Sequence, residues 1–334
     1  MIKKSKVSNA SLVALYLGIQ HFSIGQINLA DHLNFSGTTS FGYVSESVEG
    51  THDVDDIEFQ QIIFQIGLKN GPLSGKLFID FPNIEANVDA AFVRYELGEI
   101  TSLTAGKMYS QLLFEEILLV NRATRTHGYG YFSEVIPETS TGIKWLADTE
   151  KGWLGVSWLN QIWKHPTRDT NSLGNGSGSV ELQLGFRPME GLEVAIAFGG
   201  QDSGNVDPNG QMFDVWISHQ GQKHLLALEY TDFENTGVRD LDNDGVYAAS
   251  EFLSGNAFLM LGSYQISDAY SLALRYSRIS PENTNKVDQW TMAPTVDLND
   301  RLSLRGDFSH QTVNIAGSSD QSNESFSIEA LFQF

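Results

Sequence analysis

One segment of the chain carries acidic residues at the spacing of a calcium-binding loop. Residues 240–251 match every signature position of the twelve-residue calcium loop. Its oxygen ligands would be side chains and one backbone carbonyl, from Asp240, Asp242, Asp244, Val246 and Glu251. Gly245 would permit the sharp turn that such a loop requires. No helical pattern flanks the segment, so we expect a structural Ca2+ in an external loop; the alternative is a coincidental acidic turn.

A second group of charged residues surrounds the long segment 110–139. Acidic side chains on an inward-folded loop, opposite basic side chains on a pore wall, create a transverse field that favours polar solutes. The residues expected to form such a pore constriction are Glu115, Glu116, Arg122, Arg125, Lys107 and Lys144. Alternatively, the apolar runs 112–114 and 117–119 form a short amphipathic helix, and the two glutamates are merely solvated. The two interpretations are compatible.

Residue patterns typical of enzymes are sparse, and we expect no catalytic residues. The eight histidines are scattered, and none lies in a His-x-x-x-His motif. Asp307 and Ser309 share one face of a predicted strand, whereas His310 points to the other face, so one strand cannot assemble a catalytic triad. A calcium-dependent barrel phospholipase is the enzymatic alternative, and a non-conducting structural or adhesive barrel is the third possibility.

The elements that must position these residues are strands of about ten residues with alternating polarity. In 178–187, for example, Val180, Leu182 and Leu184 alternate with Glu181 and Gln183. About sixteen such strands are predicted, at 33–46, 56–68, 74–82, 88–97, 101–109, 140–148, 152–161, 178–187, 191–199, 210–219, 222–231, 255–265, 269–278, 288–297, 301–310 and 323–334. An even number of strands with an apolar and a polar face predicts an all-β fold, a transmembrane antiparallel β-barrel.

The connections alternate between short and long, as in barrels with periplasmic turns and external loops. The longest, 110–139, follows the fifth strand, and two Leu-rich runs in it favour folding into the barrel. The last strand, 326–334, alternates without a break and stops on Phe334. Such a strand is typical of outer-membrane barrels, and we expect the barrel-assembly machinery to bind it.

Composition and the N-terminus agree with export to the outer membrane. Three lysines, a short apolar run and small residues predict a signal peptide over 1–25, followed by one barrel domain over 26–334. The chain has no cysteine, which excludes disulfides and thiolate metal sites. Its net charge of −20 argues against nucleic-acid binding, because phosphates would meet a repulsive surface.

The region 105–145 carries the most specific family pattern. A strand bearing Gly-Lys leads into a long loop with acidic residues, an Asn-Arg stretch follows, and Thr-Gly starts the next strand; the residues are Gly106, Lys107, Asn121, Arg122, Thr141 and Gly142. This pattern resembles the OmpL-like β-barrel porins. The resemblance implies an outer-membrane porin that passes small hydrophilic solutes and ions passively, surrounded by membrane lipid and lipopolysaccharide. The sequence does not decide whether the porin is a homotrimer, because the loop lacks the Pro-Glu-Phe-Gly-Gly-Asp run of trimeric general porins.

Overall fold

Strands make up most of the computed structural model, which describes residues 27–48, 54–81, 86–110, 112–114, 123–124, 135–137, 139–163, 178–202, 209–236, 252–282, 284–314 and 320–334. The strands are β1 (Ile27–Ala30), β2 (Leu33–Val48), β3 (Val54–Asn70), β4 (Leu73–Asp80), β5 (Asn87–Glu96), β6 (Thr101–Tyr109), β7 (Thr139–Thr149), β8 (Gly152–Leu159), β9 (Ser179–Met189), β10 (Leu192–Gln201), β11 (Gly210–Gln220), β12 (His224–Glu234), β13 (Gly255–Gln265), β14 (Tyr270–Pro281), β15 (Lys286–Asn299), β16 (Leu302–Asn314) and β17 (Gln321–Gln333). No helix among these residues is long and apolar enough to cross a membrane.

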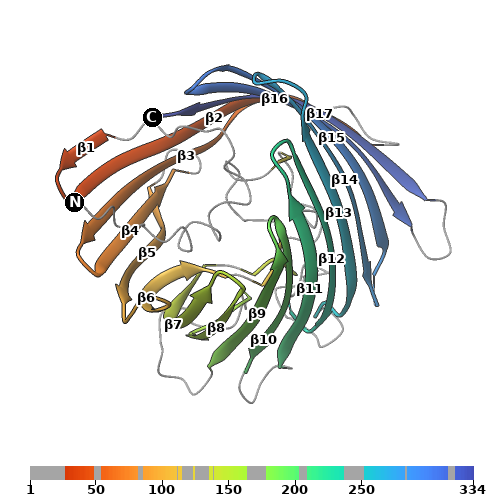
Figure 1. The fold of residues 1–334 in the computed structure, drawn as a ribbon. Coiled ribbons are helices and arrows are strands. Elements are labelled where there is room, and N and C mark those ends of the chain that lie inside the picture. Colours follow the sequence, from red (N-terminus) through yellow and green to blue (C-terminus); the bar gives the residue numbers. More distant parts are fainter. Residues whose placement is uncertain are drawn as a thin grey trace.

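The strands β2 to β17 form one closed antiparallel barrel. Each pairs with the next in chain order, and β17 pairs with β2, as Figure 1 shows. The barrel therefore has sixteen strands, and the fold predicted from the sequence is confirmed. Each predicted range corresponds to one of these strands. The short β1 pairs with the first residues of β2 and is absent from the predicted set, because four residues are too few to reveal an alternating pattern.

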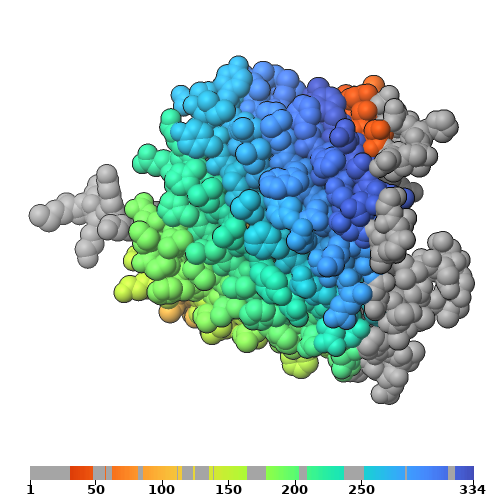
Figure 2. Space-filling view, turned by 90° about the vertical axis from the view of Figure 1, so that its right-hand side faces the viewer, coloured from red at the N-terminus to blue at the C-terminus, as the bar shows by residue number. Residues whose placement is uncertain are grey.

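Side chains alternate between the two faces of the barrel wall. On β9, Glu181 and Gln183 are buried, while Leu182, Leu184 and Phe186 are exposed. The same period continues on β11 to β17, whose outer face is seen in Figure 2. Apolar side chains outside and polar ones inside suit a barrel in lipid, since charge on the lipid-facing side costs about 2–4 kcal/mol at the bilayer midplane.

Aromatic residues at the strand ends divide between the two faces. Trp158 and Trp290 are exposed on the outer face, where aromatic girdles meet the membrane interface. Trp153 has the inward parity of β8, and its indole Nε1–H donates a hydrogen bond to the buried Glu193 at 2.7 Å. Trp153 therefore does not belong to an aromatic girdle on the outer face.

The connections alternate in length around the barrel and define its two ends. Short turns join β3 to β4, β5 to β6 and every later odd strand to the following even strand. We call this the turn end and the opposite rim the loop end. The connection between β6 and β7, residues 110–138, lies at the loop end. The predicted signal peptide, 1–25, lies outside the described residues.

The barrel closes where Phe334 meets Gly37. Two backbone hydrogen bonds join them, from the N–H of Gly37 to the Phe334 carbonyl at 2.9 Å and from the N–H of Phe334 to the Gly37 carbonyl at 3.0 Å. The ring of Phe334 lies over Gly37, where a Cβ atom would come within 2.4 Å of it. Phe35 and Phe64 pack around this ring, with centroids 5.8 and 6.0 Å away. A side chain at position 37 would displace this packing.

Candidate functional site: the barrel interior

The inner wall carries a dense set of charged groups. Lysine, arginine, aspartate and glutamate side chains lie buried on the inward face, namely Lys144, Glu181, Glu193, Asp214, Glu229, Arg275, Arg305, Asp307 and Glu329. Buried charges are retained only when they are paired or hydrogen-bonded. The partners of these groups show which parts of the lumen are filled by protein.

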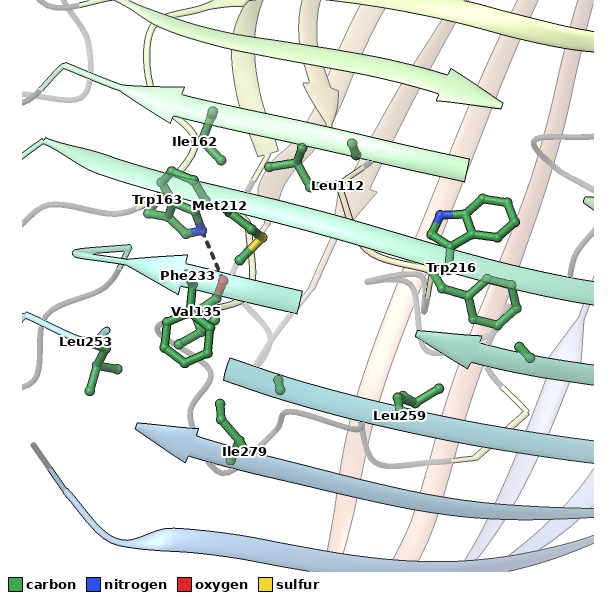
Figure 3. Packing of buried hydrophobic residues seen from close by; sticks show 14 of the residues in the cluster. Leu112, Val135, Ile162, Trp163, Met212, Trp216, Phe233, Leu253, Leu259 and Ile279 are labelled. Atoms are coloured by element: carbon green, nitrogen blue, oxygen red, sulfur yellow. Dashed lines mark hydrogen bonds between the residues drawn. The ribbon is translucent and has the colours of Figure 1, made fainter. Parts of the chain in front are cut away.

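Described parts of the segment between β6 and β7 lie inside the barrel. Leu112, Phe114 and Val135 belong to one buried apolar cluster with inward-facing residues of β10 to β14. Figure 3 shows Leu112 and Val135 beside wall residues of this cluster. The ring of Phe114 lies 5.4 Å from that of Trp216, centroid to centroid. The Cδ1 atom of Leu112 comes within 2.5 Å of the position a Cβ atom would take at Gly199. Apolar burial thus fixes these pieces on the wall.

Hydrogen bonds fix the same pieces to charged wall residues. The backbone N–H of Phe114 donates to Oε1 of Glu229 at 2.5 Å. Arg275 donates from Nη1 to Oγ1 of Thr124 at 2.6 Å and from Nη2 to Oγ1 of Thr291 at 3.1 Å. Most of the segment lies outside the described residues, so its inward course as a whole stays a prediction.

Residues that follow β8 also fold onto the inner wall. Oε1 of Gln201 on β10 accepts the backbone N–H groups of Ile162 at 2.6 Å and Trp163 at 2.9 Å. The indole of Trp163 donates to the carbonyl of Val135 at 3.0 Å, drawn as a dashed line in Figure 3. Two connections are thereby joined to each other and to β10.

A lysine and a glutamate lie together on the inward faces of β7 and β9. Lys144 is 8% exposed and interacts electrostatically with Glu181, which is 2% exposed. Ser110, the residue after β6, donates from Oγ to Oε1 of Glu181 at 2.5 Å. Glu181 therefore links the start of the long segment to the wall beside Lys144.

Two arginines of the wall are neutralised by carboxylates. Arg305 on β16 donates to Glu329 on β17, from Nε at 2.9 Å and from Nη2, and Ser40 on β2 donates to the same carboxylate. This network crosses the seam where the barrel closes.

At the turn end, Arg187 pairs with two carboxylates. It binds Asp148 at 2.8 Å and Glu193 at 3.1 Å, joining β7, β9 and β10. One positive and two negative charges leave this group with a formal charge of −1.

Of the six predicted pore residues, the structure describes two, and these two lie on opposite faces of the wall. Lys144 faces the lumen. Lys107 pairs with Thr141, which lies on the same face of β7 as the exposed Ile143, so Lys107 points to the outer face. Its Nζ donates a hydrogen bond to the carbonyl of Val88 at 2.7 Å. Lys107 and Lys144 thus lie on opposite faces of the wall, because their positions in the paired strands differ in parity, and Lys107 does not face the lumen. The other four, Glu115, Glu116, Arg122 and Arg125, lie outside the described residues.

The predicted calcium loop, with Asp240, Asp242, Asp244, Val246 and Glu251, also lies outside the described residues. The described region includes the other chemically suggestive pattern, on β16. Asp307 and Ser309 are buried on the inward face, whereas His310 is on the outer face, 3.5 Å from Glu324. The geometry agrees with the sequence-based expectation that this strand forms no triad.

Some wall residues were not singled out from the sequence. Asp214 and Glu229 occupy positions of β11 and β12 that point inward. The alternation along these strands is the sequence signal that could have identified them. Gln201 ends its strand and carries no charge, so nothing in the sequence marks it. Its role depends on contacts with a distant connection.

These observations define the class of the protein. Sixteen antiparallel strands close into a barrel with an apolar outer face, a charged inner wall, and turns of unequal length at its two ends. This is the architecture of outer-membrane porins.

The chain belongs to the family described as "Putative beta-barrel porin-2, OmpL-like", whose profile matches residues 33–334. It is an outer-membrane porin, as the resemblance in the sequence implied. No curated protein sequence matches the chain.

Solved structures of porins share the fold at low sequence identity. OmpF of Salmonella typhi in complex with daunomycin has a TM-score of 0.69 and 13% identity, over 92% of this chain and 100% of that one. OprB of Pseudomonas putida gives 0.68 and 8%, over 91% and 94%. An anion-selective porin from Comamonas acidovorans gives 0.65 and 11%, over 90% and 99%.

Proposed function

We propose that this porin passes small hydrophilic solutes and ions by passive diffusion through a lumen narrowed from one side. The observation that carries the proposal is the contact of Leu112, Phe114 and Thr124 with the inner wall of β10 to β14. Protein that fills one side of a sixteen-stranded barrel leaves a smaller aqueous passage along the other. We place the narrowest part between this filling and the wall of β5 to β7.

Charged groups on that wall would determine which solutes pass. Arg94 and Glu96 form a pair at 2.9 Å, and their side chains are 26% and 38% exposed. Lys144 lies on the same wall but is only 8% exposed and interacts with Glu181, so the Arg94 and Glu96 pair should contribute more. Opposite charges facing one passage favour dipolar solutes over apolar ones. Glu115, Glu116, Arg122 and Arg125 are proposed to supply the facing charges from the segment between β6 and β7.

A weak to moderate preference for cations is expected. The Arg187 group has a net negative charge at the turn end, and Arg305 is neutralised by Glu329. Wall arginines therefore oppose cations less than their number suggests. The preference should fade at high salt, since the Debye length falls to about 3 Å at 1 M.

Planar-bilayer recording of the purified protein tests this function. Open-channel conductance is expected, with a reversal potential in a KCl gradient that indicates cation preference at low salt. The double variant Asp148→Asn with Glu193→Gln should shift the reversal potential toward anions, whereas Glu150→Gln in the exposed turn should not. Absence of conductance would refute the channel, and clear anion preference of the unmodified protein would refute the charge argument.

A catalytic role is not part of the proposal. On β16 the inward Asp307 and Ser309 are separated by the sheet from His310, which argues against a hydrolase site there. Release of fatty acid from phospholipid vesicles, dependent on Ca2+, would instead favour the phospholipase alternative.

For residues 240–251 we propose structural Ca2+ binding at the loop end. The support is the sequence pattern, with Asp240, Asp242, Asp244 and Glu251 as carboxylate ligands and Val246 as a carbonyl ligand. The affinity should be modest, about 10⁻⁴–10⁻³ M as in extracellular modules.

A further inference from the structure

Two histidines face each other across the turn between β11 and β12. His219 lies near the end of β11 and His224 begins β12. Nδ1 of His219 is 3.0 Å from Nε2 of His224, and the rings are stacked with centroids 5.1 Å apart and an interplanar angle of 19°. One nitrogen of each ring therefore faces one nitrogen of the other ring.

The turn itself holds the rings in this position. The backbone N–H of Gly221 donates to the carbonyl of His224 at 2.8 Å, which closes the turn. A Cβ atom at Gly221 would lie 2.3 Å from Cε1 of His224, so the imidazole ring lies directly over the glycine. Glycine at this position lets the His224 ring fold back toward His219.

Both rings lie on the outer face at the turn end, outside the lumen. His219 pairs with Leu226 and His224 pairs with Tyr264, and these two partners are exposed. In outer-membrane barrels short turns face the periplasm. The partly buried pair is therefore outside the solute pathway, at the end of the barrel that faces the periplasm.

The separation of the two nitrogens matches that of two ligands on one metal ion. Imidazole nitrogens bind Zn2+ at about 2.0–2.1 Å. Two nitrogens at that distance, with an angle between about 90° and 110°, are about 2.8–3.4 Å apart. The observed 3.0 Å lies within this range.

We propose that His219 and His224 form a binding site for a divalent transition-metal ion such as Zn2+. Neutral imidazole is a preferred ligand of Zn2+, Cu2+ and Ni2+, whereas Ca2+ and Mg2+ prefer oxygen. When the ion binds, the ring that donates the hydrogen bond between the facing nitrogens carries its proton on its other ring nitrogen instead, and both rings rotate so that the two lone pairs point at the ion. Water completes the coordination on the exposed side.

Calorimetric titration of the detergent-solubilised porin with Zn2+ tests the site. One ion should bind to the unmodified protein, and His219→Gln or His224→Gln should each weaken binding at least tenfold, because one imidazole loses the chelating partner. His32→Gln is the matched control, since His32 lies exposed at the same end of the barrel and its replacement should leave binding unchanged. Ca2+ should not compete with Zn2+ for this site.

A fourth variant separates metal binding from turn folding. Gly221→Ala removes no ligand but displaces the His224 ring, and should weaken Zn2+ binding at unchanged barrel stability. Equal Zn2+ affinity in the unmodified protein, His219→Gln and His224→Gln would overturn the proposal, and so would loss of binding in His32→Gln alone. If the three proteins bind Zn2+ equally, the contact between the two histidines is only a hydrogen bond across the turn.

Discussion

Replacement of Glu329 by alanine should destabilise the barrel more than any exposed charge substitution on the same strand. Its carboxylate accepts hydrogen bonds from Nε and Nη2 of Arg305 and from Ser40. The Glu329 and Arg305 side chains are 0% and 3% exposed. Glu329→Ala would remove the buried carboxylate that accepts two hydrogen bonds from the Arg305 guanidinium.

The magnitude follows from the burial of this ion pair. Removing one partner of a buried ion pair costs about 3–5 kcal/mol. Since about 1.4 kcal/mol corresponds to a factor of ten, the folding equilibrium constant should fall more than about a hundredfold. Glu324→Ala is the matched control, because the Glu324 side chain is 76% exposed and its loss should cost less than about 0.5 kcal/mol.

Urea unfolding in lipid vesicles, followed by tryptophan fluorescence, measures both variants. The double variant Arg305→Met with Glu329→Met should recover most of the lost stability, because an apolar pair of similar volume needs no counter-charge. If Glu329→Ala unfolds at the same urea concentration as Glu324→Ala, the seam network does not contribute as argued.

Two further predictions concern the seam and the loop end. Gly37→Ala should lower the free energy of unfolding by about 1–3 kcal/mol, because the added methyl group would overlap the Phe334 ring. Gly262→Ala is the control, since a methyl group has room there and should leave stability unchanged. Melting curves in detergent compare the two variants, and equal melting temperatures would contradict the seam packing. Asp240→Ala should abolish the protection that Ca2+ gives to the connection between β12 and β13 against protease, and cleavage that is identical with Ca2+ and with chelator would exclude the proposed calcium loop.

The barrel was predictable because its period is visible in the sequence. Lipid on one face and a polar lumen on the other impose strict alternation, so runs such as Val180 to Phe186 mark both the strand and its inward face. Short turns mark the odd-to-even connections in the same way. The four-residue β1 has no such signal, since its pairing depends on the edge of β2 left uncovered beyond Phe334.

The contents of the lumen were less predictable than its wall. Leu112 and Phe114 indicate a buried surface, but the sequence does not show that β10 to β13 supply it. Lys107 and Lys144 lie close to the same long segment in sequence, yet they lie on opposite faces. Proximity along the chain was a poor guide there, because the face of a strand residue depends on its parity. Gln201 joins two connections through contacts that no local pattern encodes.

The pairing of β17 with β2 has a consequence for the time course of folding. Ser40 and Glu329, which meet across it, are 289 positions apart in the chain. Contacts of such long sequence separation form slowly, because the entropy of the intervening chain must be lost before they contribute. Until then β2 and β17 each present an unpaired edge that can associate with another chain. Variants that weaken the seam should therefore lower the yield of folded barrel as well as its stability, through a longer-lived open intermediate.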